Sequence, residues 1–215
     1  MDLLQRNHQL LLKGINCTFL RYLHARIEWE DRLIGIFGSR GVGKTTLLLQ
    51  HIKLKFEDSR EALYVNLDDF WFETHSLTDA VKEFLQAGGH YLFLDEIHFY
   101  SGWMEEVSTL LDANPALKIV FATTSLYSQT EVRNGLRHEA AFYVMHPMSF
   151  REFLSYESIL DKDPIPLEDI LANHHDLVKE INAEMNIVPI YRNYLEHGCY
   201  PFYWQDPDMY YFRLQ

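Results

Sequence analysis

The chain of 215 residues is 47% hydrophobic and 23% charged, a globular composition that excludes a disordered or fibrous protein. Its 19 Lys and Arg residues against 31 Asp and Glu residues give a formal net charge of −12 at pH 7, so the bulk charge does not support a nucleic-acid partner or an anionic membrane surface. Cys17 and Cys199 show neither a disulfide framework nor zinc-ligand spacing, and no run approaches the roughly 18 apolar residues of a membrane span. We therefore expect a cytoplasmic protein with no membrane segment.

Five short apolar runs alternate with helix-length segments after an N-terminal helical segment, residues 1–30. The runs are continuous rather than alternating, as in strands that helices cover on both faces, and they span residues 32–37, 62–67, 91–95, 118–123 and 141–145. The segments between them that have helix length are residues 44–57, 77–87, 103–113 and 128–139. We predict an α/β core over residues 31–147, a five-stranded parallel sheet with helices on both faces.

The pattern changes to helices alone after Pro147. Residues 149–158, 167–185 and 188–198 read as helices, and Ser149 with Glu152 forms a capping box at the first of them. We predict a small helical lid over residues 148–198. The aromatic residues 199–215 are expected to begin a linker or a C-terminal domain that is missing from the sequence.

A phosphate-binding loop is predicted between the first strand and the first long helix, where the sequence reads GSRGVGKT over residues 38–45. Glycines let the backbone curl so that successive N–H groups point at phosphate oxygens, and the helix N-terminus favours the same negative charge. Lys44 is expected to contact the β- and γ-phosphates, and the Thr45 hydroxyl to ligate Mg²⁺. The predicted nucleotide-binding residues are Gly38, Ser39, Arg40, Gly41, Val42, Gly43, Lys44, Thr45, Thr46 and Thr124. The alternative is a glycine-rich surface turn, which the strand–loop–helix setting disfavours.

The third run ends in an acidic pair, Asp95 and Glu96, at the edge of a parallel sheet where ligands bind. Asp95 is expected to hold Mg²⁺, and Glu96 to take a proton from an attacking water. The alternative is a pair of solvated carboxylates at a strand end. His98, which follows the pair, is interpreted as a packed strand-end histidine, with contact to the nucleotide or the magnesium shell as the alternative. No Asn-Lys-x-Asp stretch of guanine-specific proteins occurs, so ATP is the favoured nucleotide, with residues 22–29 as candidates for an apolar shelf under its base.

Hydroxyl groups follow the fourth strand, and arginines precede and follow the fifth. Thr123, Thr124 or Ser125 is expected to face the γ-phosphate, or else to cap the next helix. A cation on the γ-phosphate is the remaining requirement for fast hydrolysis. The candidates are Arg133, Arg137 and Arg151, with Arg137 assigned the catalytic role; each has the alternative of a solvated surface arginine. An arginine that acts on a neighbour's nucleotide would require a homo-oligomer.

Four stretches together resemble a known family: GSRGVGKTTLLLQ, YLFLDEIHFYSGW, PMSFREFL and GCYPFYW. They are similar to the bacterial and archaeal AAA+-type ATPases in which a P-loop domain precedes a C-terminal nuclease-like domain. The resemblance implies an additional-strand core, with the phosphate-loop strand between the fourth and fifth strands, and a helical lid after it. It also implies that Lys44 and Thr45 bind phosphate and Mg²⁺, that Asp95 is the magnesium acid, and that Glu96 is the base.

The expected function is therefore Mg-dependent ATP binding and hydrolysis that drives a conformational change of an attached domain or partner. A nucleotide-gated binding module with negligible turnover is the second hypothesis. A P-loop kinase acting on a small molecule is a third, less favoured because Glu96 suits activation of water and no acceptor pocket is evident.

Overall fold

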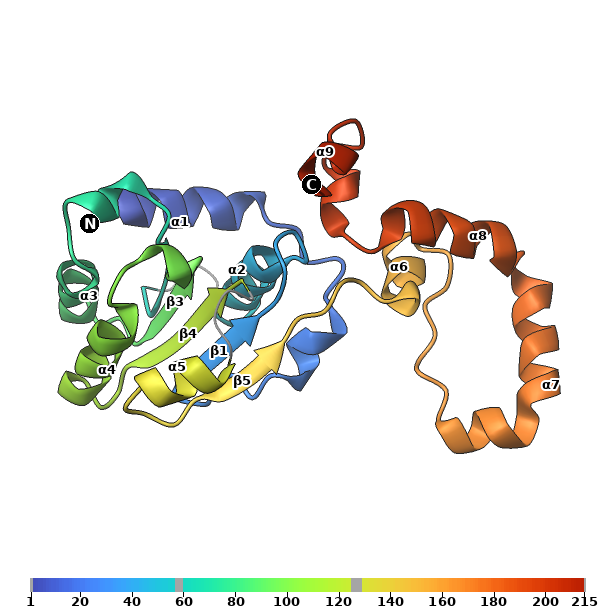
Figure 1. The fold of residues 1–215 in the computed structure, drawn as a ribbon, viewed down its shortest axis with the longest axis horizontal. Helices are drawn as coiled ribbons and strands as arrows, with labels where there is room; N and C mark the ends of the chain where they lie inside the picture. Colours follow the sequence, from blue (N-terminus) through green and yellow to red (C-terminus); the bar gives the residue numbers. More distant parts are fainter. Residues whose placement is uncertain (1, 57–59, 125–128, 215) are drawn as a thin grey trace. The chain divides into compact units, whose positions relative to one another are not determined.

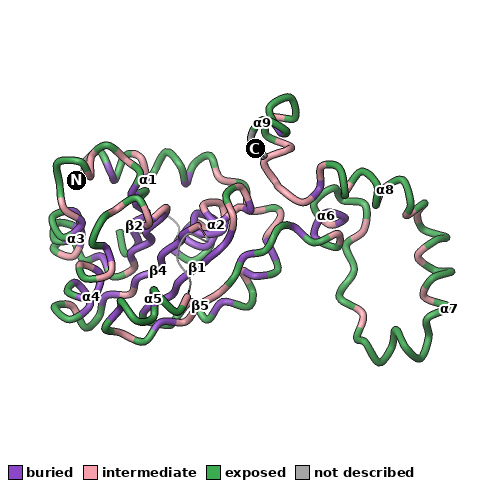
Figure 2. Tube along the Cα trace, in the orientation of Figure 1, coloured by how far each residue is buried: buried purple, intermediate pink, exposed green. Residues whose placement is uncertain are grey.

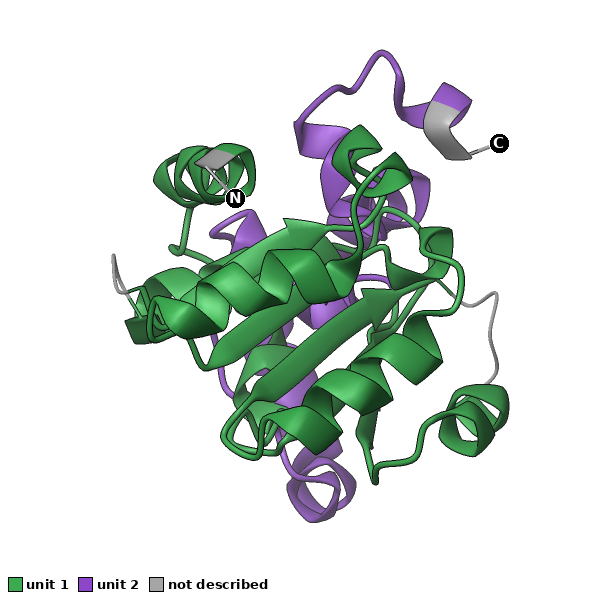
Figure 3. Cartoon of the chain, turned by 90° about the vertical axis from the view of Figure 1, so that its left-hand side faces the viewer, with its two compact units in different colours: residues 1–146 green, residues 147–215 purple. Residues whose placement is uncertain are grey.

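The computed structural model describes residues 2–56, 60–124 and 129–214 (Figure 1). The chain divides into two compact units, Met1–His146 and Pro147–Gln215, which Figure 3 draws in different colours. Each unit has its own buried residues.

The first unit contains a parallel sheet of five strands in the order β2-β3-β4-β1-β5. The strands are β1 (Leu33–Phe37), β2 (Ala62–Asn66), β3 (Tyr91–Asp95), β4 (Lys118–Thr123) and β5 (Ala141–Val144). The predicted five-stranded parallel sheet is confirmed, and β1 lies between β4 and β5 as the additional-strand arrangement requires. Because the strands are parallel, all five carboxyl ends meet at one edge of the sheet.

Helices cover both faces of the sheet (Figures 1 and 3). The side chains of Leu63, Leu92 and Ile119 share one core cluster with residues of α3 (Leu77–Gln86), α4 (Trp103–Ala113) and α5 (Gln129–Gly135). On the opposite face Phe93 packs against the aromatic side chains of α2 (Lys44–Phe56). Strands β1 and β4, at the centre of the sheet, are almost wholly buried (Figure 2), which explains their continuous apolar sequence.

The N-terminal segment belongs to the same unit as the sheet. Its helix α1 (Asp2–Gly14) packs against α2 and against the edge strand β2. A short 3₁₀ helix, η1 (Tyr22–Arg26), follows α1. Two others lie within the α/β core, η2 (Phe70–Glu73) after β2 and η3 (Ile97–Phe99) after β3.

Helix α5 ends at Gly135, four residues before the predicted end at residue 139. Gly135 packs so closely on α4 that a Cβ there would lie 2.2 Å from the sulfur of Met104. Beyond it Leu136 and Ala140 are buried in the core, so the chain leaves the helix to begin β5.

The second unit is helical. It contains α6 (Phe150–Tyr156), α7 (Leu167–Glu184), α8 (Ile187–Asn193), a π-helical turn η4 (Tyr194–Gly198), η5 (Pro201–Trp204) and α9 (Tyr210–Leu214). The predicted capping box of Ser149 and Glu152 is present. Phe153 of α6 is buried against Gly198, Tyr194 and Trp204, so the aromatic residues after 198 pack on this unit.

Both cysteines, Cys17 and Cys199, are free. Within the described ranges, the model contains no helix with the length and apolarity needed to cross a bilayer.

Candidate nucleotide site

The loop between β1 and α2 requires its three glycines for two different reasons. Gly41 and Gly43 have positive φ angles of 81° and 100°, a region that side-chain-bearing residues rarely adopt. Gly38 has no room for a side chain, because a Cβ there would lie 2.5 Å from the carbonyl oxygen of Met145 at the end of β5. The loop is thus curled in the way that phosphate binding requires and is pressed against the neighbouring strand.

Lys44 begins α2 and folds back over the loop. Its Nζ donates hydrogen bonds to the carbonyl oxygens of Gly38 at 2.9 Å and Ser39 at 3.0 Å. Burial lowers the pKa of Lys44, and the charges of Glu96 and Asp95 oppose that shift. The ammonium is therefore held over the loop, where it can exchange loop carbonyls for phosphate oxygens.

Asp95, the last residue of β3, is 1% exposed and accepts three hydrogen bonds. Its Oδ2 accepts from the Thr45 hydroxyl at 2.5 Å and from the Tyr64 hydroxyl at 2.9 Å, and its Oδ1 accepts from the Glu96 backbone N–H at 2.9 Å. A buried carboxylate needs such donors to offset its lost hydration. The structure thus brings together Thr45 and Asp95, the two residues predicted to bind metal.

These residues fit a magnesium ion that a nucleotide helps to hold. Mg²⁺ prefers oxygen ligands and is usually bound through one or two carboxylates together with substrate phosphates and water. Thr45 and Asp95 supply oxygen atoms beside the phosphate loop. Among the described residues no group of three or more His, Cys, Asp or Glu side chains is placed to hold a metal by itself.

Glu96 follows in the left-handed conformation, with φ 50° and ψ 40°. Such a backbone is uncommon for a residue with a side chain and is typical of functional sites. Burial raises the pKa of Glu96, as does the charge of Asp95, while Lys44, His98 and Arg40 act in the opposite direction. A carboxylate with a raised pKa is a better proton acceptor near neutral pH.

His98 links Glu96 to the end of β4. Its Nδ1 lies 3.4 Å from Glu96 Oε2 and 3.4 Å from the Thr123 hydroxyl, and its Nε2 lies 3.5 Å from the Thr124 hydroxyl. The side chain is only 7% exposed, in agreement with a packed histidine, but it contacts the predicted base and the predicted γ-phosphate residue as well. Ser125, the third hydroxyl candidate, lies outside the described residues.

The structure does not bring Arg137 to this site. Its guanidinium contacts Asp112 at 2.9 Å and Thr109 at 3.2 Å, both on α4. That end of α4 lies near the amino ends of the strands, opposite the phosphate loop. There Arg32, just before β1, donates to the carbonyl oxygens of Leu111 and Asn114. Because α5 ends early and the chain must return to this edge to begin β5, a side chain at position 137 cannot reach its own phosphate loop.

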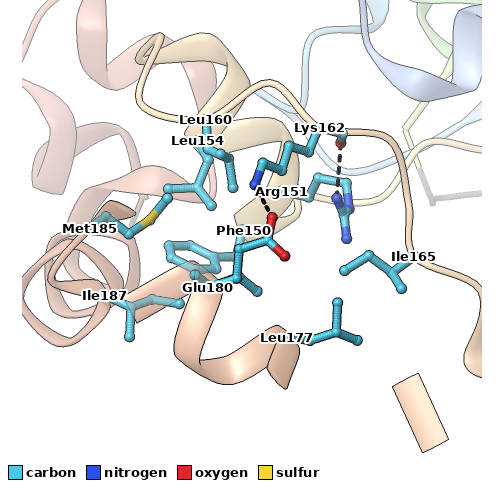
Figure 4. Close-up of a pocket in the computed structure, with 11 residues that line it drawn as sticks. Phe150, Arg151, Leu154, Leu160, Lys162, Ile165, Leu177, Glu180, Met185 and Ile187 are labelled. Atoms are coloured by element: carbon cyan, nitrogen blue, oxygen red, sulfur yellow. Dashed lines mark hydrogen bonds and ion pairs between the residues drawn. The ribbon is translucent and has the colours of Figure 1, made fainter. Parts of the chain in front are cut away.

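The other candidate arginines also have partners elsewhere. Arg133 lies over the ring of Phe142 on β5, 4.9 Å from its centroid. Arg151 donates to the carbonyl oxygens of Lys162 and Asp163 beside a cavity of about 200 Å³ in the helical unit (Figure 4). Arg40, exposed on the phosphate loop, is instead close enough to lower the pKa of Glu96.

Sequence reasoning did not find two buried side chains that hold the site. Tyr64 on β2 is bonded to Asp95, as described above. Arg21, 6% exposed, donates to the carbonyl oxygen of Val42 in the loop at 2.7 Å and to that of His146 after β5 at 2.8 Å. Neither residue lies in a sequence motif, so only the three-dimensional structure identifies them.

One residue of the range 22–29, the candidates for a shelf under the nucleotide base, packs away from the phosphate loop. Trp29, within the range considered, stacks on His51 at 3.7 Å between ring centroids and donates its Nε1–H to the carbonyl oxygen of His24. His51 lies about two turns into α2, so Trp29 packs beside the helix body rather than at the loop.

A parallel sheet with a curled loop after β1 and an acidic pair at the end of β3, with Asp95 buried, defines a P-loop nucleotide-binding protein. The chain belongs to the AAA domain family, whose model matches residues 30–154, more than half of the sequence. This membership supports nucleotide binding and ATPase-type chemistry in general terms.

Three solved structures illustrate the similarity, and the search of curated proteins finds no match. AMPPCP-bound DnaA from Aquifex aeolicus is 15% identical, with a TM-score of 0.41, over 88% of this chain and 57% of that one. PCH-2 from C. elegans is 16% identical, with a TM-score of 0.37, over 78% and 49%. The Walker-type ATPase PABY2304 of Pyrococcus abyssi is 15% identical, with a TM-score of 0.44, over 76% and 66%. The chain therefore spans about half to two thirds of the length of these proteins.

Proposed function

We propose that this chain is a magnesium-dependent ATPase whose nucleotide state moves the helical unit and an attached domain or partner. The observation that carries the proposal is the buried Asp95 carboxylate, which accepts the Thr45 hydroxyl at 2.5 Å and is followed directly by Glu96. A protein that only binds nucleotide would not need a second acid at this point.

Each side chain has a role that follows from its position. Loop N–H groups and Lys44 bind the phosphates, and Thr45 with Asp95 would hold Mg²⁺, which supplies charge neutralisation at the phosphates when bound. Glu96 accepts a proton from a water molecule as the water oxygen bonds to the γ-phosphorus. The bond from that phosphorus to the β,γ-bridging oxygen breaks, so ADP and inorganic phosphate result.

Contacts of the loop within the first unit support a mechanical output. Gly38 lies against the Met145 carbonyl, and Arg21 bonds both the loop and His146. His146 directly precedes the second unit. A change in the loop on phosphate release is therefore expected to alter the backbone from which the helical unit begins.

The proposal is tested by phosphate release from Mg-ATP over a range of protein concentrations. We expect turnover that Glu96→Gln reduces by about 10² to 10⁴, the contribution typical of a general base. Glu105→Gln, on the exposed side of α4, is the matched control and should keep wild-type turnover. Turnover per protomer that rises with concentration would support a homo-oligomer in which a neighbour supplies the missing cation, with Arg137 as the predicted residue.

A second candidate is a nucleotide-gated binding module with negligible turnover. The contacts of Arg137 with Asp112 and Thr109 favour the binding module, because they keep the Arg137 guanidinium away from the γ-phosphate bound by the same chain. Tight ATP binding with no phosphate release above the Glu96→Gln background would support this candidate and contradict the ATPase. Transfer of labelled γ-phosphate to a small molecule rather than to water would instead indicate a kinase.

A further inference from the structure

Tyr64 occupies a position from which it can orient the predicted metal-binding carboxylate. It lies on β2, is 5% exposed, and donates its hydroxyl hydrogen to Asp95 Oδ2 at 2.9 Å. The Thr45 hydroxyl donates to the same oxygen at 2.5 Å. Two hydroxyl groups from different elements therefore fix one carboxylate oxygen.

Sheet geometry explains how Tyr64 reaches Asp95. In the parallel pairing of β2 with β3, Tyr64 is opposite Phe93 and Asn66 is opposite Asp95. Side chains two residues apart lie on the same face, so Tyr64 and Asp95 are diagonal neighbours on the face that α2 covers. A phenol is long enough to span this diagonal, whereas serine or threonine at position 64 would be too short.

The backbone of Tyr64 is itself held. Strand β2 is an edge strand, and the N–H of Tyr64 donates to Nδ1 of His8 on α1 at 3.0 Å. The residue is thus fixed at its backbone by α1 and at its hydroxyl by Asp95. A side chain held at both ends is suited to keep a carboxylate in one orientation.

We propose that Tyr64 is a positioning residue for the magnesium site: its hydroxyl keeps the Asp95 carboxylate oriented toward Thr45 and the phosphate loop. This inference rests on the proposed function and adds a residue that lies outside the loop and the acidic pair. Partners of metal ligands commonly change metal affinity by 10- to 100-fold when they are removed.

The test compares Tyr64→Phe with Tyr91→Phe in the full chain. Both variants remove one phenol oxygen from neighbouring strands of the same sheet. Tyr91 is the first residue of β3 and so lies at the amino ends of the strands, away from the site. Its hydroxyl is 3.3 Å from Glu30 and from Lys118. A fluorescent ATP analogue measures Kd with Mg²⁺ and with EDTA, and the ratio of the two Kd values gives the tightening due to the metal.

We expect the metal-dependent tightening to fall about 10-fold or more in Tyr64→Phe, with Kd in EDTA unchanged and Tyr91→Phe like wild type. Tyr64→Met, a second side chain without a donor, should show the same loss, and circular dichroism checks that each variant is folded. A wild-type ratio in both folded Tyr64 variants, or an equal loss in Tyr91→Phe, would overturn the positioning role of Tyr64 and leave the proposed function standing. A wild-type protein that binds the analogue equally with Mg²⁺ and EDTA would overturn the metal-dependent function and this inference together.

Discussion

At the scale of single residues, the site combines side chains from the motifs with buried side chains from outside them. The loop and the start of α2 present Lys44 and Thr45, and Asp95 ends strand β3. Arg21 supports this arrangement from the N-terminal segment, because its guanidinium bonds carbonyl oxygens of Val42 and His146. A planar guanidinium can bond two separate acceptors at once, which a lysine ammonium on a shorter reach cannot do in the same geometry.

We predict that Arg21→Lys weakens nucleotide binding about 10-fold and lowers the thermal midpoint of unfolding. The reason is the loss of a charged hydrogen bond to a buried carbonyl oxygen, worth about 1.5 to 3 kcal/mol. Arg26→Lys is the control, since Arg26 is exposed at the end of η1, the 3₁₀ helix that follows Arg21, and lies over the ring of Tyr22. Calorimetric ATP titration and thermal denaturation measure the two effects. Wild-type affinity and stability in Arg21→Lys would refute the role of this contact.

The sequence predicted those site residues that belong to short local motifs. The glycine loop fixes where Lys44 and Thr45 lie, and a strand-end position fixes Asp95. The position of Arg137 could not be predicted, because it depends on where α5 ends and on which edge of the sheet receives the chain. Arg21 and Tyr64 act through contacts between segments far apart in sequence, which no local pattern records.

At the scale of elements, helix α1 protects an edge of the sheet. Its own Leu4 and Leu12 are buried. His8, about one turn from each, accepts a hydrogen bond from the backbone N–H of Tyr64 on edge strand β2. An uncovered edge strand exposes unpaired N–H groups and invites pairing with other chains. The contact requires an unprotonated Nδ1, and burial lowers the pKa of His8 to about 4.

This contact predicts a loss of stability as the pH falls. Between the unfolded pKa of about 6.5 and the folded value of about 4, the unfolded chain binds a proton that the folded chain excludes, so the free energy of unfolding decreases with decreasing pH. Burial likewise lowers the pKa of His51, to about 3, and adds to the same trend.

His8→Gln keeps an acceptor but cannot titrate, so from pH 7 to pH 5 it should lose about 1 to 2 kcal/mol less stability than wild type. Urea denaturation at the two pH values measures this difference. His174→Gln, on an exposed part of α7, should behave like wild type. An equal loss in His8→Gln and wild type would show that His8 does not carry the pH dependence.

The strands were predictable because a strand that is buried on both faces has a continuous apolar sequence, which marks its position in the chain. For β3 and β4 the predicted bounds, 91–95 and 118–123, agree with the structure, and each of the other three strands differs by one residue at one end. Helix ends were harder, as α5 shows, because its end at Gly135 is followed by residues that enter the core through long-range packing, Leu136 and Ala140. The kink of α7 at Asn173 had no signal in the sequence pattern.

At the scale of the whole molecule, the residues assigned to nucleotide and metal all lie in the first compact unit, Met1–His146. The second unit buries Phe153 among its own aromatic side chains. We predict that a fragment of residues 1–146 folds and binds Mg-ATP. A ligand at 100 times its Kd should stabilise the fragment by about 2.7 kcal/mol, visible as a raised thermal midpoint. A fragment that is folded but not stabilised by Mg-ATP would show that the helical unit supplies an essential part of the site.

The central claim is that Glu96 turns a bound nucleotide over rather than only helping to bind it. The most direct measurement is single-turnover conversion of labelled ATP to ADP, with protein in excess over nucleotide and Mg²⁺ present, in wild type and Glu96→Gln. We predict equal amounts of bound nucleotide and conversion at least about 100-fold slower in the variant. Equal rates of conversion in the two proteins, or bound ATP that neither converts, would contradict the account.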